Sequence, residues 1–255
     1  MVTISIMNQK GGVGKSTSTR NLGAFFALKG YKTLLIDIDA QANLSQLCHI
    51  PPDATNTVLD IFHDKASCIY DVSENLFIIP SSVDFAGIEL ELVGDNHDPY
   101  LLNRVLQKLG ASFDVCLIDC PPAINMVTTN ALSASGWVLI PMEASFLAFN
   151  GLETMLKVIS MVREGLNPDL SILGAFINKY KGNTVVTRNI VYQMKEKGID
   201  IALFSTKVRQ FEDIRKAELM KKSIFEYSKS GLAVADYRNL GHEILDKLKE
   251  NQSIV

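Results

Sequence analysis

The sequence lacks the features of a membrane-spanning, secreted or zinc-binding protein. No run of apolar residues approaches the roughly 18 that a transmembrane helix needs. The first strand pattern starts at residue 2, so we expect no leader peptide. The four cysteines, Cys48, Cys68, Cys116 and Cys120, include no CxxC pair. We therefore expect a cytoplasmic protein with free thiols and no membrane span, in which Cys116 and Cys120 serve core packing.

Charge is distributed unevenly along the chain. The whole sequence has a net charge of −3. Residues 1–178 alone have a net charge of −8, whereas residues 179–229 carry 12 basic and 6 acidic side chains, a net charge of +6. A basic segment on an acidic protein indicates a localised anionic partner. Lysines scattered over solvated helical faces would give the same balance, so the sequence alone leaves both interpretations open.

Short apolar runs alternate with helical patterns along the chain. Continuous apolar strands separated by helices are typical of a parallel sheet that is covered on both faces. With 255 residues, 47% of them hydrophobic, the chain is long enough for one domain with a sizeable core. We predict an α/β fold, a mostly parallel twisted sheet with helices on both faces, that binds its ligand at the carboxyl ends of the strands. The expected strands are residues 2–7, 33–37, 76–79, 114–118, 137–141, 172–177 and 200–204. The expected helices are residues 17–29, 82–93, 100–110, 127–135, 147–165, 184–197 and 232–250.

A glycine-rich segment, residues 8–17, stands between the first apolar run and the first helical pattern. Strand, glycine loop and helix form the context of a phosphate-binding loop. Glycines let backbone N–H groups wrap an anion, and the first turn of the helix adds further unpaired N–H groups. In such a loop Lys15 reaches the β- and γ-phosphates of a nucleotide, and the Ser16 hydroxyl ligates Mg²⁺.

The start of this loop departs from the usual P-loop. The position six residues before Lys15 is Gln9 instead of glycine, and a second lysine, Lys10, follows it. The segment KGGVGKS resembles the deviant Walker A motif of the ParA/MinD superfamily of P-loop ATPases. The resemblance implies ATP and Mg²⁺ as cofactors, and a Lys10 that reaches the nucleotide of the other subunit in a dimer. The nucleotide-binding residues that it implies in this loop are Lys10, Gly11, Gly12, Val13, Gly14, Lys15, Ser16 and Thr17.

Carboxylates follow two of the expected strands. The segment 37–43, DIDAQAN, resembles the switch I pattern DxDPQxN of the superfamily, with Ala40 where proline is usual. By that resemblance Asp39 orients the attacking water and holds a water on Mg²⁺, while Asp37 is structural. Asp119 follows the expected strand 114–118, ahead of two prolines, in a Walker B arrangement that binds Mg²⁺ through water. The expected catalytic residues are therefore Lys10, Lys15 and Asp39.

The nucleobase is expected further along the chain. An amide can pair with the N6 and N7 edge of adenine, and the resemblance puts such a contact at Asn178, after the strand 172–177. It puts further contacts, at Thr206 and Val208, on an expected loop over residues 205–208. Asn178 as a plain strand-end cap is the alternative.

The resemblance runs from Met1 to about Lys249 and is closest to ParA/Soj-type partition ATPases. It implies one domain over residues 1–255 without an N-terminal helix-turn-helix domain. It also implies an ATP-dependent homodimer that binds DNA non-specifically, lies on the nucleoid, and is released when a ParB-like centromere-binding protein stimulates hydrolysis. We expect DNA contacts from the basic segment 179–229, first from Arg209, which lies in a Val-Arg pair that resembles one in chromosomal partition proteins. The further candidates are Lys207, Arg215, Lys216, Lys221 and Lys222.

Other functions remain open at this stage. A MinD-like membrane-cycling ATPase would favour lysine and arginine on the polar face of the terminal helix, but that face mixes both signs, so we expect this helix to dock on the core and expect no membrane partner. An ATPase that positions a protein complex, a non-hydrolysing nucleotide-gated scaffold and a nitrogenase-like reductase are further alternatives. The reductase would need cysteines that bridge a cluster between subunits. The nucleotide-binding motifs are common to chromosomal and plasmid partition proteins and do not identify the cargo.

Overall fold

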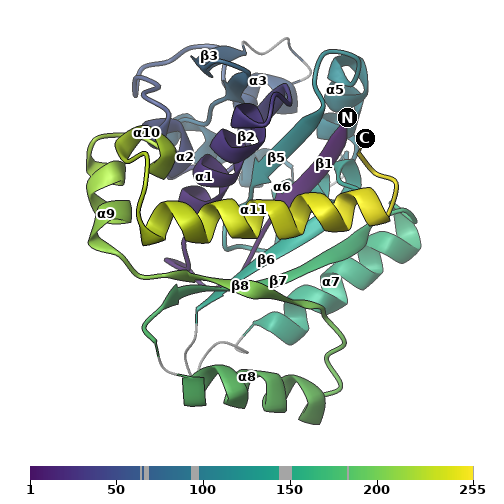
Figure 1. The fold of residues 1–255 in the computed structure, drawn as a ribbon. Helices are drawn as coiled ribbons and strands as arrows, with labels where there is room; N and C mark the ends of the chain where they lie inside the picture. The colour runs from purple at the N-terminus through teal and green to yellow at the C-terminus, as the bar shows by residue number, and fades with distance from the viewer. Residues whose placement is uncertain (64, 66–68, 93–97, 144–150, 183, 255) are drawn as a thin grey trace.

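An eight-stranded twisted sheet runs through the centre of the computed structural model (Figure 1). The structure describes residues 1–255 except 64, 66–68, 93–97, 144–150, 183 and 255. The strand order is β3-β4-β2-β5-β1-β6-β7-β8, and all neighbouring pairs are parallel except β3 with β4. The strands are β1 Val2–Ile6, β2 Thr33–Asp37, β3 Tyr70–Ser73, β4 Leu76–Ile79, β5 Val115–Asp119, β6 Trp137–Glu143, β7 Ser171–Tyr180 and β8 Leu203–Arg209.

Helices cover both faces of this sheet, as the sequence predicted. Alternate residues of one strand enter different cores: Leu35 of β2 packs with α1 and α11, whereas Leu34 and Ile36 pack with helices on the opposite face. The helices are α1 Lys15–Leu28, α2 Asn43–Leu47, α3 Val58–Phe62, the 3₁₀ helix η1 Val83–Gly87, α4 Ile88–Glu91, α5 Leu101–Leu109, α6 Met126–Ala134, α7 Leu152–Gly165, α8 Thr184–Glu196, α9 Glu212–Leu219, α10 Ile224–Tyr227 and α11 Leu232–Glu250.

One expectation about local structure was wrong, and several short elements were not predicted. The strand expected over residues 200–204 starts three residues later and continues to Arg209, so the loop expected over residues 205–208 is part of β8. The short elements β3, α2, α3, α9 and α10 were not predicted. The first residues of the helix expected over 147–165 lie outside the described residues.

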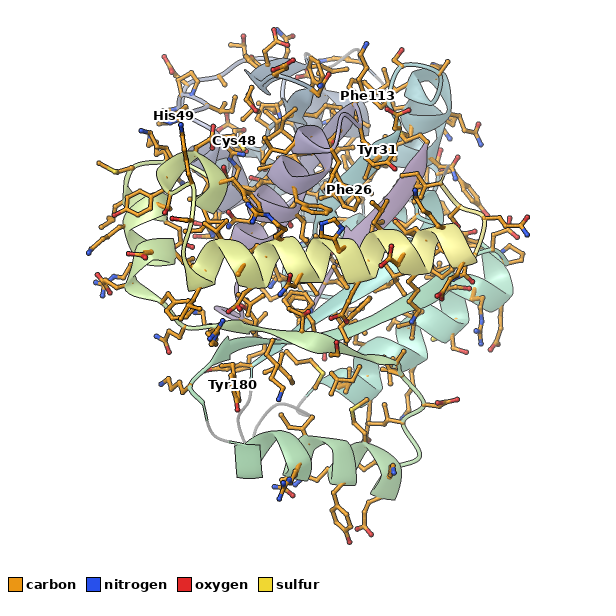
Figure 2. The ribbon with its side chains drawn as sticks, viewed as in Figure 1. Phe26, Tyr31, Cys48, His49, Phe113 and Tyr180 are labelled. Carbon is orange, nitrogen blue, oxygen red and sulfur yellow. The ribbon has the colours of Figure 1, made fainter. Side chains whose placement is uncertain are left out.

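The cysteines agree with the expectation of packing. Cys48, Cys116 and Cys120 are buried free thiols, and burial raises the pKa of each. Cys68 lies outside the described residues. In Figure 2 Cys48 lies beside α1, in the interior of the molecule.

The terminal helix docks on the core, as predicted. Figure 1 shows α11 running across one face of the sheet, and its stripe from Tyr237 to Leu248 is buried against α1 and the strands beneath. The two helices meet where Gly241 lies against the ring of Phe25, and that ring also packs edge-on to Phe26 and His242. No helix in the described part of the chain is long and apolar enough to cross a membrane.

The contact between α11 and α1 yields a test of stability. A Cβ at position 241 would lie 2.6 Å from Cγ of Phe25, so Gly241→Ala should destabilise the protein by about 1–3 kcal/mol, although alanine normally favours a helix over glycine by about 1 kcal/mol. Urea unfolding measures the difference. Gly165→Ala, at the end of α7 with open space around it, is the matched control and should leave stability unchanged or slightly raised. Equal stability of the two variants would contradict the packing described for α11.

Candidate nucleotide-binding site

The glycine loop lies at the centre of the sheet, between β1 and α1. Gly12 and Gly14 adopt left-handed backbone conformations, with φ of +73° and +88°. A Cβ at Gly14 would also clash with the side-chain amide of Asn178 on β7. Glycine is therefore required at position 14 by backbone conformation and by space.

The first turn of α1 is open to a ligand. The helix begins at Lys15 and has no side-chain cap, so its N–H groups face the loop. The Lys15 side chain is buried, and Nζ donates to the backbone oxygen of Asn8, 3.2 Å away, across the loop. An ammonium and unpaired N–H groups around one loop form an anion site.

A cleft of about 800 Å³ opens over this loop. It is bordered by the loop, by the segment after β2 and by the prolines after β5, so the carboxyl ends of adjacent strands meet in it as predicted. Its lining includes Gly11, Gly12, Gly14, Lys15, Ser16, Thr17, Asp39, Gln41, Pro121, Pro122, Lys179, Glu218, Leu219 and Lys221.

Asp119 is the unusual group beside the cleft. Its carboxylate is fully buried, and neither oxygen has a hydrogen-bond partner among the described residues. Burial raises the pKa of Asp119 well above its usual value, and the negative charge of Asp37 raises it further. The Ser16 hydroxyl approaches this carboxylate without reaching hydrogen-bond geometry. A buried carboxylate without donors, next to a hydroxyl, fits a site for a hydrated Mg²⁺ ion.

The two switch I carboxylates have different environments. Asp37 is buried and accepts hydrogen bonds from the backbone N–H and the hydroxyl of Ser45, at 2.8 and 2.7 Å. Burial raises the pKa of Asp37 to about 6 in spite of these bonds. Asp39 is only partly buried and lines the cleft, where it accepts a hydrogen bond from the N–H of Gln41. Asp37 therefore fixes the backbone, and Asp39 keeps a carboxylate oxygen open to the cleft.

Lys10 lies at the other end of the loop and is not among the residues that line the cleft. Its Nζ forms an ion pair with Glu143, at 2.5 Å from Oε2, at the end of β6. Sequence reasoning missed Glu143, because a single acidic residue at a strand end has no distinguishing pattern.

A second hollow, of about 410 Å³, adjoins the loop on its β7 side. Asn178 lines it, but the Asn178 amide donates to the backbone oxygen of Val13 at 2.7 Å, and its Oδ1 accepts from the N–H of Lys179. Asn178 thus ties β7 to the glycine loop. The hollow is lined by Gly14, Thr17, Asn178, Lys179, Arg209, Gln210, Phe211, Glu212, Ile214, Arg215, Glu218 and Tyr237.

The positions of Thr206 and Val208 differ from the expectation. Both lie inside β8; the Thr206 hydroxyl donates to Glu243, Val208 is buried in the core, and neither lines the cleft or the second hollow. Gln210 and Phe211, which follow the true end of β8, line the second hollow instead. The sequence pattern ended this strand five residues too early, so the loop expected over residues 205–208 was wrong, while the base contacts expected of Thr206 and Val208 stay predictions.

Arg209 has a structural partner. Its guanidinium binds Asp236 through Nε at 2.9 Å and Nη2 at 2.6 Å, and it lies over the ring of Phe211. Asp236 is buried, with 5% of its surface exposed, so this pair joins β8 to α11. The Arg209 side chain is still 37% exposed, and its expected contact with DNA stays a prediction.

The remaining basic candidates fall into two groups. Lys207 lies 4.9 Å from the ring centre of Tyr180, on the side of the sheet that faces α8 in Figure 2. The other four are exposed on α9 and the turn that follows it, where Lys221 also lines the cleft. These four are Arg215, Lys216, Lys221 and Lys222.

Comparisons with known proteins agree with this geometry. The family model described as an AAA domain matches residues 1–172. The chromosome-partitioning ATPase Soj of Treponema pallidum is 36% identical over 248 residues, which are 95% of this chain and 96% of that protein. Cobyrinic acid a,c-diamide synthase of Mycobacterium smegmatis, solved with an ATP analogue and magnesium, superposes with a TM-score of 0.85 at 27% identity, over 100% of this chain and 98% of that one.

The septum site-determining protein MinD of Pyrococcus horikoshii, complexed with Mg-ADP, superposes with a TM-score of 0.77 at 26% identity, over 100% of this chain and 99% of that one. These findings confirm the predicted superfamily and fold, and the nucleotides and magnesium in the two solved structures agree with ATP and Mg²⁺ as the expected cofactors. The match to Soj spans nearly all of both chains, and the chain therefore belongs to the Soj/ParA group of P-loop ATPases in the ParA/MinD superfamily.

Proposed function

We propose that this chain is a DNA partition ATPase that acts as one domain over residues 1–255. Mg·ATP binding brings two subunits face to face, the dimer binds DNA of any sequence on the nucleoid, and a ParB-like partner triggers hydrolysis and release. Nucleotide binding is supported by one observation above all: the buried carboxylate of Asp119 has no hydrogen-bond partner within the described part of the chain and lies beside Ser16 at an open helix N-terminus.

The proposal gives a role to each of the following residues. The N–H groups of the loop and the Lys15 ammonium hold the phosphates. The Ser16 hydroxyl and, through water, Asp119 and Asp39 hold Mg²⁺, which neutralises charge that develops on the transferred phosphoryl group. The Asp39 carboxylate also orients the attacking water, since positioning is the main contribution that a protein makes to phosphoryl transfer. Lys10 stabilises the phosphates of the second subunit.

A membrane-cycling role is the second candidate, because the fold is also that of MinD. The docking of α11 favours DNA over a membrane, since the apolar stripe of this helix is already covered by the core. Transport of a protein complex on DNA would use the same nucleotide cycle and differs only in the cargo.

Loss of the P-loop lysine tests the nucleotide site. Lys15→Ala should weaken ATP and ADP alike by roughly 10- to 100-fold, because it removes a charged donor from phosphates that both nucleotides carry. Titration with fluorescent analogues of both nucleotides measures the affinities. Lys108→Ala, an exposed lysine on α5, is the control and should bind as the unmodified chain does. The same affinity in the Lys15 and Lys108 variants would overturn the P-loop assignment.

Removal of the Asp39 carboxylate tests whether ATP binding can be separated from ATP hydrolysis. Asp39→Ala should slow hydrolysis by about two orders of magnitude while ATP still binds, because the water is no longer oriented. The dimer should therefore persist in ATP. Phosphate release and sedimentation in ATP give the two readouts, with the exposed Asp53→Ala as the control. A rate equal to that of the control would move the water-positioning role to another residue.

DNA binding is tested with Lys216→Ala and Lys222→Ala, because both lysines are exposed and neither lines the cleft or the second hollow. Arg209 is unsuited, because its removal would leave the buried Asp236 unpaired. Each lost phosphate contact should flatten the slope of log affinity against log salt by about 0.9, equally for all duplex sequences. Binding with ATP is measured by fluorescence anisotropy, with Lys249→Ala as the control. Binding of the ATP-loaded chain to anionic liposomes and not to DNA at low salt would replace the partition function by the membrane-cycling one.

A further inference from the structure

The Lys10 ammonium is held within its own subunit. Its Nζ lies 2.5 Å from Oε2 of Glu143, and each side chain is about one-third exposed, at 32% and 31%. The deviant Walker A motif assigns Lys10 to the nucleotide of a second subunit, but it assigns no role to Glu143. The lysine must therefore leave this carboxylate before it can act in a dimer.

The backbone brings the two side chains together. The Asn8 amide donates to the backbone oxygen of Pro141 at 2.7 Å, and its Oδ1 accepts from the N–H of Lys10 at 2.9 Å. One asparagine thus fixes the start of the loop against the end of β6, where Glu143 lies. Because the backbone is already ordered on both sides, the ion pair costs only the ordering of two side chains.

Positively charged side chains surround the Glu143 carboxylate. The hydrogen bond from Lys10 lowers the pKa of the Glu143 carboxyl, and the charges of Lys179 and Lys181 lower it further. Lys179 itself reaches the loop, where its ammonium donates to the backbone oxygen of Gly12 at 2.7 Å. Glu143 therefore stays ionised and offsets part of the positive charge beside the loop.

Charge decides where the Lys10 ammonium binds most strongly. Glu143 offers one negative charge, whereas a nucleoside triphosphate offers several, and one more phosphate than a diphosphate. We propose that Glu143 is a positioning residue that retains Lys10 in its own subunit, so that assembly needs the additional charge of a triphosphate in the facing subunit. This inference rests on the ATP-dependent dimer of the proposed function. It adds the residue that opposes dimer formation until a triphosphate is bound.

The first test is the strength of the ATP dimer. Glu143→Gln removes the charge and keeps the shape, so the dimer should become tighter. A partly exposed pair should contribute a factor of roughly two to three for each lysine, and two lysines per dimer make about fivefold in the dissociation constant. Sedimentation equilibrium in ATP measures it. The affinity of the single subunit for ADP should stay within about twofold, which separates release of Lys10 from a change in the cleft.

Three variants make this comparison specific. Glu143→Asp keeps the charge and should dimerise like the unmodified chain. Glu153→Gln removes the partner of Lys197, an exposed pair of the same 2.5 Å length that joins α7 to the residue after α8, and should change nothing. Lys10→Ala should lose the dimer with or without Glu143. A Glu143→Gln dimer that is unchanged or weaker, while Lys10→Ala stays monomeric, would overturn the retention of Lys10 and leave the proposed function intact.

A second readout needs no dimer. In the nucleotide-free single subunit, an amine-reactive label should modify Lys10 about threefold faster in Glu143→Gln than in the unmodified chain, while Lys197 stays unchanged. Mass spectrometry of the labelled peptides gives both rates. Equal labelling of Lys10 in the two proteins would show that Glu143 does not hold it. If Lys10 of the unmodified chain is labelled at the expected rate but the chain never dimerises in ATP, the result would instead contradict the proposed function. It would then also contradict the proposed effect of Glu143 on dimer formation.

Discussion

The close approach of Gly14 to Asn178 is the constraint on which both hollows of the site depend. The Asn178 amide binds the oxygen of Val13 and fills the space that a side chain at position 14 would need. This contact ties the glycine loop to β7 and places the phosphate cleft on one side of the loop and the second hollow on the other. A nucleotide that spans both hollows must pass this point, where Thr17 and Glu218 line both.

Three carboxylates close to one another differ because their donors differ. Ser45 supplies two hydrogen bonds to Asp37, which is thereby committed to holding the backbone of switch I. Asp119 is as deeply buried but has no donor among the described residues, and a buried charge in that state is costly unless a cation joins it. Asp39 is partly exposed and retains contact with water. Environment therefore separates a structural group, a group suited to a metal ion and a group suited to orienting water.

The sequence predicted the parts of the site that are local. The glycine loop, both switch carboxylates and Asp119 follow strands whose apolar runs are readily recognised, and the parallel sheet brings their carboxyl ends together. Contacts between distant segments could not be predicted, since Glu143 meets Lys10 across 133 residues and Asp236 meets Arg209 across 27. The end of β8 was missed because its polar residues, Ser205 to Lys207, interrupt the apolar run. Gln210 and Phe211, which follow the observed end of β8, line the second hollow, whereas Thr206 and Val208 do not.

Helix α9 and the turn after it lie between the cleft and the exposed side chains of Lys216 and Lys222. Glu218 and Leu219 at its end, and Lys221 just after it, line the cleft, whereas Lys216 and Lys222 face solvent. The Thr17 hydroxyl donates to Glu218, so α9 is held to the first turn of α1, the turn that would receive the phosphates. Lys216 lies on the same helix as Glu218, two residues before it, and Lys222 lies three residues beyond the end of that helix. This short path gives the proposed dependence of DNA binding on ATP a physical basis within one subunit, before any contact with a second one.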